Sequence, residues 1–538
     1  MSASKMIRGT LILTISTFIA KFLGIFFVIP YQAMAGLEGT YLYAVAYTPY
    51  SIILSISTMG LPLAVSKFVS KYNALGDYES GKRLFRSGIV LMSLTGVVGF
   101  LVMFLGAPQF VALSKVSAGN FNHVVLVMRV CAIAILVVPV MSLMRGYFQG
   151  FQSMGPTAVS QLVEQIGRVG FILISSFIIL KLMNGSVVTA AVFATFAAFI
   201  GAVAGFYVML HYWVKRRAVI KKQEEAHQYR PHRYKMPLRG MYKELITYAI
   251  PFVGVGIAMQ VYQLIDQMMA NHYLVYGKVM RDAIVSDLTM NDQKMVMIPV
   301  TLATSLAVSA VPAVIVSYTK GDLNDVNDKI TEALQLVLFL TIPASIGLSA
   351  LGYQVHGLLY KIDPGSYPAI GGAILTWYAP TAIFFSLFQV GASILQGINH
   401  QRVTLIALSA GIIVKLLTNP ICMKLLGGVG AVVATDLGYG LSIIIIMTAI
   451  RRATDYHFMS VANQTVHIII YTMLMALVIV GILILFGGAG VPRSRALAAI
   501  SIPLCIVVGI LVYMGCAYYT GLLRKVLGQR FFNRFHRG

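Results

Sequence analysis

Long apolar runs separated by short polar clusters make up most of this chain, from the first residues to about residue 521. Each run is about 20 residues long, which is the length of a helix that crosses a bilayer. We count fourteen such runs. They begin near Ile7, Leu42, Leu84, Val124, Pro156, Val187, Tyr242, Met295, Val326, Ala369, Arg402, Val429, Val461 and Arg495. The pattern predicts an all-α polytopic membrane protein with fourteen transmembrane helices.

Two dipeptides recur at nearly equal distances, which indicates an internal duplication. Gly76-Asp77 returns as Gly321-Asp322 after 245 residues, and Gln149-Gly150 returns as Gln396-Gly397 after 247 residues. Six helices per copy give two pseudo-symmetric lobes in the same orientation, as in transporters with a central cleft. The predicted divisions are a first lobe at 1–214, a basic cytoplasmic linker at 215–241, a second lobe at 242–452, two further helices at 453–521 and an amphipathic basic tail at 522–538.

Composition and charge agree with a membrane protein. Hydrophobic residues make up 58% of the chain and charged residues 11%, against about 45–50% and 25% in soluble domains. The net charge of +23 does not indicate nucleic acid, because the basic residues lie in clusters between apolar runs. One set of alternate loops, with both termini, holds 27 Lys and Arg, and the opposite set holds 9. The positive-inside rule therefore predicts cytoplasmic termini in the cell membrane.

Catalytic and metal-binding patterns are missing from the sequence. The four cysteines (Cys131, Cys422, Cys505 and Cys516) lie in apolar stretches without paired spacing, so neither disulfides nor zinc is expected. The segment GDYESGKR from Gly76 to Arg83 is one residue short of a nucleotide-binding loop and ends in Arg instead of a hydroxyl residue. We predict a transporter that is not an enzyme and has no bound cofactor. Na⁺ coupling, H⁺ coupling and the membrane potential stay open as its driving force.

Ionisable residues inside the predicted spans carry the most information about function. Each costs about 2.5–3.5 kcal/mol at the bilayer centre and therefore needs a partner or a wet cavity. They are Lys21, Lys67, Arg129, Glu164, Arg168, Asp266, Lys415 and Asp436. The first five lie in the first lobe and sum to +3, whereas the last three lie in the second lobe and sum to −1. The first lobe is therefore predicted to bind an anion such as a phosphate or pyrophosphate.

The candidate anion site comprises the five ionisable residues of the first lobe. For Lys21 and Lys67 the alternative is a lysine that snorkels to the interface. Glu164 and Arg168 are spaced to pair on one helix face with Gln161 and Gln165, and the alternative is an ion pair that orients the bundle.

The candidate ion-coupling site lies in the second lobe. Its residues are Asp266, Lys415, Asn419 and Asp436. If Lys415 reaches either carboxylate, its ammonium group occupies the place of a sodium ion.

The run MRGYFQGFQSMGPTAVSQLVEQIGRVG, from Met144 to Gly170, resembles the polysaccharide-biosynthesis and stage V sporulation branch of the multidrug/oligosaccharidyl-lipid/polysaccharide exporter superfamily. FLG at 22–24 and GLPLAVSKFVSKYNALGD at 60–77 support the resemblance. Within this branch, the chain resembles most specifically the lipid II flippases of Gram-positive bacteria. The resemblance implies that an undecaprenyl-pyrophosphate-linked peptidoglycan precursor, lipid II, is carried to the outer leaflet. The two lobes would move it by alternating access. The diphosphate would lie against Lys21 and Arg129. Expected partners are lipid II, membrane lipids and the cell-wall synthesis machinery.

Three alternative functions remain at this stage. One is export of another undecaprenyl-linked polysaccharide precursor, which charge alone does not distinguish. The second is cation-coupled multidrug export, which calls for a site lined by carboxylates and aromatic residues. The third is a membrane-embedded transferase, for which Asp322, Asp325 and Asp328 in one loop are the candidate acidic cluster. We expect these three residues to form a solvated turn and a helix start.

Overall fold

The computed structural model describes residues 3–58, 60–74, 77–151, 153–226, 238–308, 311–360, 367–488, 490–492 and 494–527. The described chain is helical, and no strand occurs in it. It divides into two compact units, unit 1 at Met1–Leu264 and unit 2 at Ile265–Gly538.

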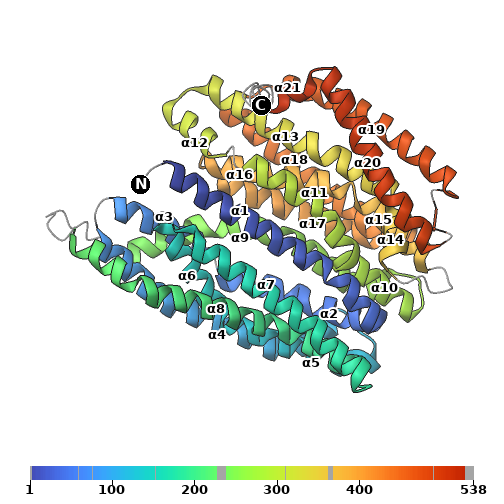
Figure 1. Ribbon diagram of the computed structural model, residues 1–538, viewed down its shortest axis with the longest axis horizontal. Coiled ribbons are helices and arrows are strands. Elements are labelled where there is room, and N and C mark those ends of the chain that lie inside the picture. Colours follow the sequence, from blue (N-terminus) through green and yellow to red (C-terminus); the bar gives the residue numbers. More distant parts are fainter. Residues whose placement is uncertain are drawn as a thin grey trace. The chain divides into compact units, whose positions relative to one another are not determined.

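Unit 1 is a bundle of long helices that run alongside one another (Figure 1). They are α1 (Ala3–Phe26), α2 (Val28–Thr58), α3 (Leu61–Ala74), α4 (Tyr78–Leu113), α5 (Ala118–Ala132), α6 (Val138–Gly150), α7 (Met154–Phe177), α8 (Val187–Ala226) and the first part of α9 (Leu238–Tyr273). Asp77 caps α4 by accepting a hydrogen bond of 3.0 Å from the Ser80 amide. The GDYESGKR segment thus supplies a helix start, as its acidic first turn favours.

Aromatic side chains form part of the core of unit 1. The ring of Phe85 lies 4.2 Å from that of Tyr147 and 4.9 Å from that of Trp213, measured between centroids. These rings join α4, α6 and α8, and Phe85 and Tyr147 are each 2% exposed. Such pairs add about 0.5–1.5 kcal/mol beyond the area that they bury. They hold α6, which carries part of the candidate site, against its neighbours.

Unit 2 continues α9 and adds a second helical bundle. Its helices are α10 (Lys278–Thr289), α11 (Asn291–Val308), α12 (Val311–Lys320), α13 (Leu323–Ala350), α14 (Gly352–Leu359), α15 (Tyr367–Tyr378), α16 (Thr381–Gly397), α17 (Gln401–Leu426), α18 (Gly428–Thr454), α19 (Met459–Leu485), α20 (Arg495–Tyr519) and α21 (Leu522–Leu527). Asp322 caps α13 by accepting a hydrogen bond of 3.1 Å from the Asp325 amide. This acidic segment is a helix start, as expected from the sequence.

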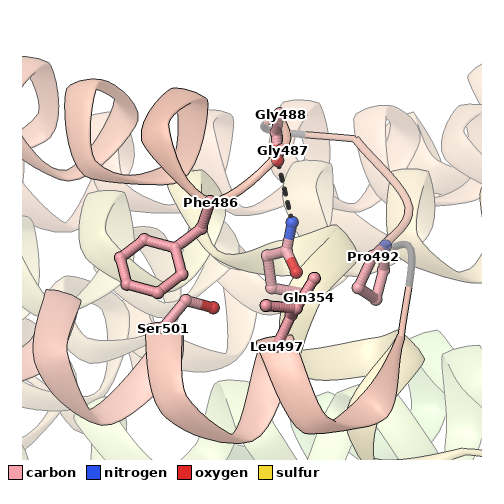
Figure 2. A pocket seen from close by; sticks show the side chains of 7 residues that line it. All are labelled: Gln354, Phe486, Gly487, Gly488, Pro492, Leu497 and Ser501. Carbon is pink, nitrogen blue, oxygen red and sulfur yellow. Dashed lines mark hydrogen bonds between the residues drawn. The ribbon is translucent and has the colours of Figure 1, made fainter.

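Helices α19 and α20 form a pair fastened to the rest of unit 2 at two places. Tyr513 in α20 donates a hydrogen bond of 2.9 Å to the Phe339 carbonyl oxygen of α13. At the other end, Gln354 Nε2 in α14 donates to the carbonyl oxygens of Gly488 and Gly490, both at 3.0 Å. Figure 2 shows Gln354 reaching up to this loop beside a small pocket. The loop between α19 and α20 is therefore bonded to α14.

Eleven helices among the described residues are long and apolar enough to cross a membrane. The first two predicted spans, which begin near Ile7 and Leu42, both overlap one of them, Ile15–Thr58. The spans predicted near Tyr242 and Met295 lie in α9 and α11, which are helical but are not among the eleven. Helix α8 continues to Ala226, so the first part of the predicted linker is helical. The rest of the linker up to residue 237, and the tail after residue 527, lie outside the described residues.

Candidate functional site

Arg168 lies on α7 against a row of tyrosines from α2. Its Nη2 donates a hydrogen bond of 2.9 Å to the Tyr43 hydroxyl, and its guanidinium carbon lies 4.9 Å from the centre of the Tyr47 ring. Tyr43 and Tyr47 are themselves stacked, with centroids 5.5 Å apart. Arg168 Nε is buried and has no hydrogen-bond acceptor among the described residues. The charge is held by cation–π and hydroxyl contacts and keeps a donor for a further acceptor.

Lys21 lies on α1, which packs along α7. The two helices are joined where the Thr17 hydroxyl donates a hydrogen bond of 3.0 Å to Gln161 Oε1. Lys21 is one turn further along α1 and therefore on the same face as Thr17. Its side chain is exposed, and it has no hydrogen bond or ion pair with the described part of the chain. Lys21 is thus a positive charge that the described carboxylates do not neutralise.

Glu164 pairs with an arginine that sequence reasoning missed. Its Oε2 lies 2.8 Å from Arg145 Nη2 of α6. The same Arg145 atom donates to the Ser160 hydroxyl at 2.7 Å, and this hydroxyl donates to the Gly205 carbonyl oxygen at 2.9 Å. The predicted pair between Glu164 and Arg168 is therefore wrong. Arg145 and Ser160, which both lie in the run from Met144 to Gly170, thus connect α6, α7 and α8.

A glycine on α8 makes this junction possible. A Cβ atom at Gly201 would lie 2.7 Å from the Glu164 carbonyl oxygen and 2.8 Å from the Arg168 Cβ atom. Only a residue without a side chain allows α8 to approach the backbone of α7 this closely. The two helices thus approach each other closely beside Glu164 and Arg168.

Of the other two cations predicted for this site, one contacts α4 and the side chain of the other is not described. Arg129 Nε donates a hydrogen bond of 3.2 Å to the Phe104 carbonyl oxygen, and its guanidinium carbon lies 5.1 Å from the centre of the Phe104 ring. Arg129 is thus turned toward α4. Lys67 belongs to α3, but its side chain lies outside the described residues.

In unit 2, two of the four ion-coupling candidates form a buried ion pair. Lys415 Nζ of α17 lies 2.6 Å from Asp266 Oδ1 of α9, and their side chains are 0% and 7% exposed. The same ammonium group donates to the Ala431 carbonyl oxygen at 2.8 Å and to the Thr435 hydroxyl at 2.6 Å. Lys415 therefore reaches Asp266, which is the condition stated from the sequence. A lysine ammonium, tethered by its own side chain, lies among three oxygen atoms.

The two remaining candidates contact different helices. Asn419 is fully buried one turn after Lys415, and its Nδ2 lies 3.4 Å from the Met269 sulfur of α9. Asp436 Oδ1 instead accepts a hydrogen bond of 2.6 Å from the Thr381 hydroxyl of α16. Asn419 thus belongs to the seam between α9 and α17 with the ion pair, whereas Asp436 is anchored to α16.

Comparison with known proteins places the chain in a family. Residues 6–316 match the family described as "Polysaccharide biosynthesis protein". The chain belongs to this family. The matched region spans more than half of the sequence and includes the signature from Met144 to Gly170, as the resemblance predicted.

Individual members and relatives of the polysaccharide biosynthesis protein family are similar over most of their length. The chain is 39% identical over 544 residues to the lipid II flippase MurJ of Bacillus subtilis (strain 168), covering 100% of this chain and 99% of that protein. It is 23% identical to stage V sporulation protein B of the same organism, over 63% of each chain. Among solved structures, an inward closed conformation of the lipid II flippase MurJ has a TM-score of 0.65 and 16% identity, covering 96% of this chain and 100% of that one. An inward-facing multidrug resistance transporter of the MATE family has a TM-score of 0.62 and 12% identity, covering 79% and 95%.

One cluster of metal-ligating side chains was not anticipated, because the sequence predicted no metal site. Asp287, Asp292 and His356 are all buried in unit 2, and one ligand atom of each lies within 4.8 Å of the others. His356 is 64 residues from Asp292. Two acidic residues before an apolar run and a single distant histidine give no metal-binding spacing, so only the fold brings them together.

Proposed function

We propose that this chain is a lipid II flippase that moves the lipid-linked peptidoglycan precursor from the inner to the outer leaflet. The observation that carries the proposal is that Arg168 and Lys21 have no carboxylate partner in the described part of the chain. Glu164, which lies on α7 with Arg168, is neutralised by Arg145 instead. Unit 1 therefore carries positive charge that suits an anionic headgroup. The 39% identity to a lipid II flippase over the full chain supports the same function.

Lys21 and Arg168 are the residues we assign to the diphosphate of the substrate. Arg168 offers a buried Nε donor in a plane fixed by the tyrosines, and Lys21 offers an exposed ammonium on the neighbouring helix. Guanidinium groups bind phosphate oxygens through two parallel hydrogen bonds, whereas lysine acts as a point charge. Arg129 and Lys67 stay predictions as further contacts. Glu164 acts through Arg145, by fixing the helix that carries Arg168.

The proposed transport cycle is alternating access by a protein with fourteen spans, arranged as six, six and two, with both termini in the cytoplasm. Moving one negative charge outward across an inside-negative membrane gains about 2.3 kcal/mol per 100 mV. The membrane potential thus favours export of an anionic headgroup without a nucleotide. Lipid II and the surrounding lipids are the proposed partners, and contact with the cell-wall synthesis machinery stays a prediction.

We further propose that Lys415 makes sodium unnecessary at the coupling site of unit 2. Its ammonium already donates to the Ala431 and Thr435 oxygens and lies 2.6 Å from the Asp266 carboxylate. A sodium ion would need these same oxygens. The membrane potential or protons then remain as the source of energy.

The test is leaflet-resolved measurement of lipid II in a strain depleted of its own flippase and complemented with variants of this chain. The unmodified chain should restore lipid II to the outer leaflet. Lys21→Ala and Arg168→Ala should leave it on the cytoplasmic face at normal membrane levels of protein. Lys181→Ala removes an exposed lysine elsewhere in unit 1 and is the matched control, which should transport normally.

Three results would contradict the proposal. Full transport by both alanine variants would remove the assigned anion site. Accumulation of a different undecaprenyl-linked glycan, with lipid II distributed normally, would favour another polysaccharide precursor as the substrate. Failure of the unmodified chain to restore lipid II, together with drug efflux that depends on a cation gradient, would favour the multidrug exporter.

A further inference from the structure

Outside the two sites described above, unit 2 contains a compact set of metal-ligating side chains. Asp287 lies in the last turn of α10, Asp292 in the first turn of α11, and His356 in α14. One ligand atom of each lies within 4.8 Å of the other two. His356 Nδ1 and Asp292 Oδ1 are 3.0 Å apart, and these side chains are 1% and 0% exposed. Three helices thus bring two carboxylates and one imidazole to a single buried point.

An unsatisfied oxygen in this cluster points to a ligand. Asp292 Oδ2 is buried and has no hydrogen-bond partner among the described residues. The amide oxygen of Asn291 is a second buried acceptor without a donor in the described chain, although its Nδ2 donates to Asp287 Oδ1 at 2.9 Å. A buried carboxylate oxygen without a donor is costly, and a bound cation would satisfy it.

We propose that Asp287, Asp292 and His356 form a binding site for a divalent transition-metal ion of the zinc or manganese type. Imidazole nitrogen together with carboxylate oxygen is a donor set for these ions, whereas calcium and magnesium bind through oxygen alone. The ligands of one tetrahedral zinc ion lie about 3.3 Å from one another. The cluster reaches that spacing by small side-chain rotations from separations of at most 4.8 Å.

The surroundings hold the imidazole in a place where it can bind. A Cβ atom at Gly371 of α15 would lie 2.1 Å from His356 Nε2, so glycine at this position leaves room for the ring. The Tyr360 hydroxyl donates a hydrogen bond of 3.2 Å to the Asn291 carbonyl oxygen and holds the end of α14 against the start of α11.

The consequence of occupancy would be structural. The ion would join the turn between α10 and α11 to α14, and Gln354 of α14 also holds the loop between α19 and α20. An ion that binds the folded form alone raises the unfolding temperature as its concentration rises. The site is therefore expected to stabilise unit 2 independently of the substrate and of the proposed flippase activity.

The experiment uses the full chain, purified in detergent with its affinity tag removed. Metal analysis of the protein purified without chelator should find one zinc or manganese ion per chain. After treatment with chelator, Zn²⁺ or Mn²⁺ should raise the unfolding temperature in a saturable manner. Asp292→Asn and His356→Gln should abolish both the bound metal and the shift. Glu332→Gln removes an exposed carboxylate of unit 2 outside the cluster and should keep both.

Several outcomes would overturn the proposal. These are a chain with no stoichiometric metal and no thermal shift with either ion, or an Asp292→Asn variant that keeps the full shift. If the variants do not fold, the Co²⁺-loaded unmodified chain decides. Weak visible bands typical of nitrogen and oxygen ligands support the site, whereas their absence, or strong thiolate charge-transfer bands, contradicts it.

Discussion

Replacing Lys415 by methionine tests the electrostatics of unit 2 most directly. The change keeps most of the side-chain volume but removes the ammonium group that lies 2.6 Å from the Asp266 carboxylate. Lys415 is 0% exposed and Asp266 is 7% exposed, so water does not solvate the Asp266 carboxylate once the ammonium group is removed. Removing one partner of such a buried pair costs about 3–5 kcal/mol. We expect Lys415→Met to lower the free energy of unfolding by this amount.

The assay is SDS titration of the purified full chain, followed by tryptophan fluorescence. A second variant, Lys415→Met with Asp266→Leu, removes both charges and should recover stability to within about 1 kcal/mol of the unmodified chain, because no unpaired charge is left. A loss below about 1 kcal/mol in the single variant would refute the reasoning, since a pair worth so little behaves like an exposed one.

The effect of sodium on the stability of a further variant, Lys415→Ala, tests the same position. Lys415→Ala leaves the Asp266 carboxylate, the Ala431 carbonyl and the Thr435 hydroxyl facing the vacated position. Oxygen ligands of this kind bind hard cations. Na⁺ should therefore stabilise Lys415→Ala more than K⁺ at equal ionic strength, and it should have no specific effect on the unmodified chain. Specific stabilisation of the unmodified chain by Na⁺ would show that Lys415 does not fill this position.

Three further predictions concern the scaffold. Glu164→Gln should cost about 1–2 kcal/mol of unfolding free energy, because it removes a charge-assisted bond to Arg145 at a partly exposed position, and SDS titration would measure it. Gly201→Val should reduce the amount of folded protein on size-exclusion chromatography, because its Cβ would overlap the α7 backbone and overpacking costs about 1–3 kcal/mol. Asp322→Ala should cost about 1 kcal/mol through the lost helix cap to Asp325 but leave lipid II transport intact. Loss of transport in a folded Asp322→Ala variant would instead revive the transferase alternative.

The sequence predicted the helical architecture because hydropathy over about 20 residues is a local property. The helix starts at Asp77 and Asp322 were equally accessible, since a capping acid followed by a helical run is read within four residues. The pairing of Glu164 was not. Spacing along α7 favoured Arg168, but the competing partner Arg145 comes from another helix, and nothing local ranks the two.

The second unit shows the same limit in another form. The contact between Lys415 and Asp266 was foreseen as a condition, because a buried lysine needs a carboxylate and only two carboxylates were predicted inside the spans of its lobe. The cluster of Asp287, Asp292 and His356 gave no such signal. Its acids lie beside a span and were not counted as intramembrane charges, and a single histidine pairs with nothing until the chain is folded.

The bonds from Gln354 to Gly488 and Gly490 have a practical consequence for spectroscopy. Two hydrogen bonds hold Gly488 and Gly490 to α14, and Val491, which directly follows Gly490, is 39% exposed. A spin label or fluorophore attached at position 491 would report the displacement of α14 and of the α19–α20 pair, because the loop is bonded to α14 on both sides of residue 489. Position 491 thus offers a natural reporter of how the second half of the protein moves during a turnover.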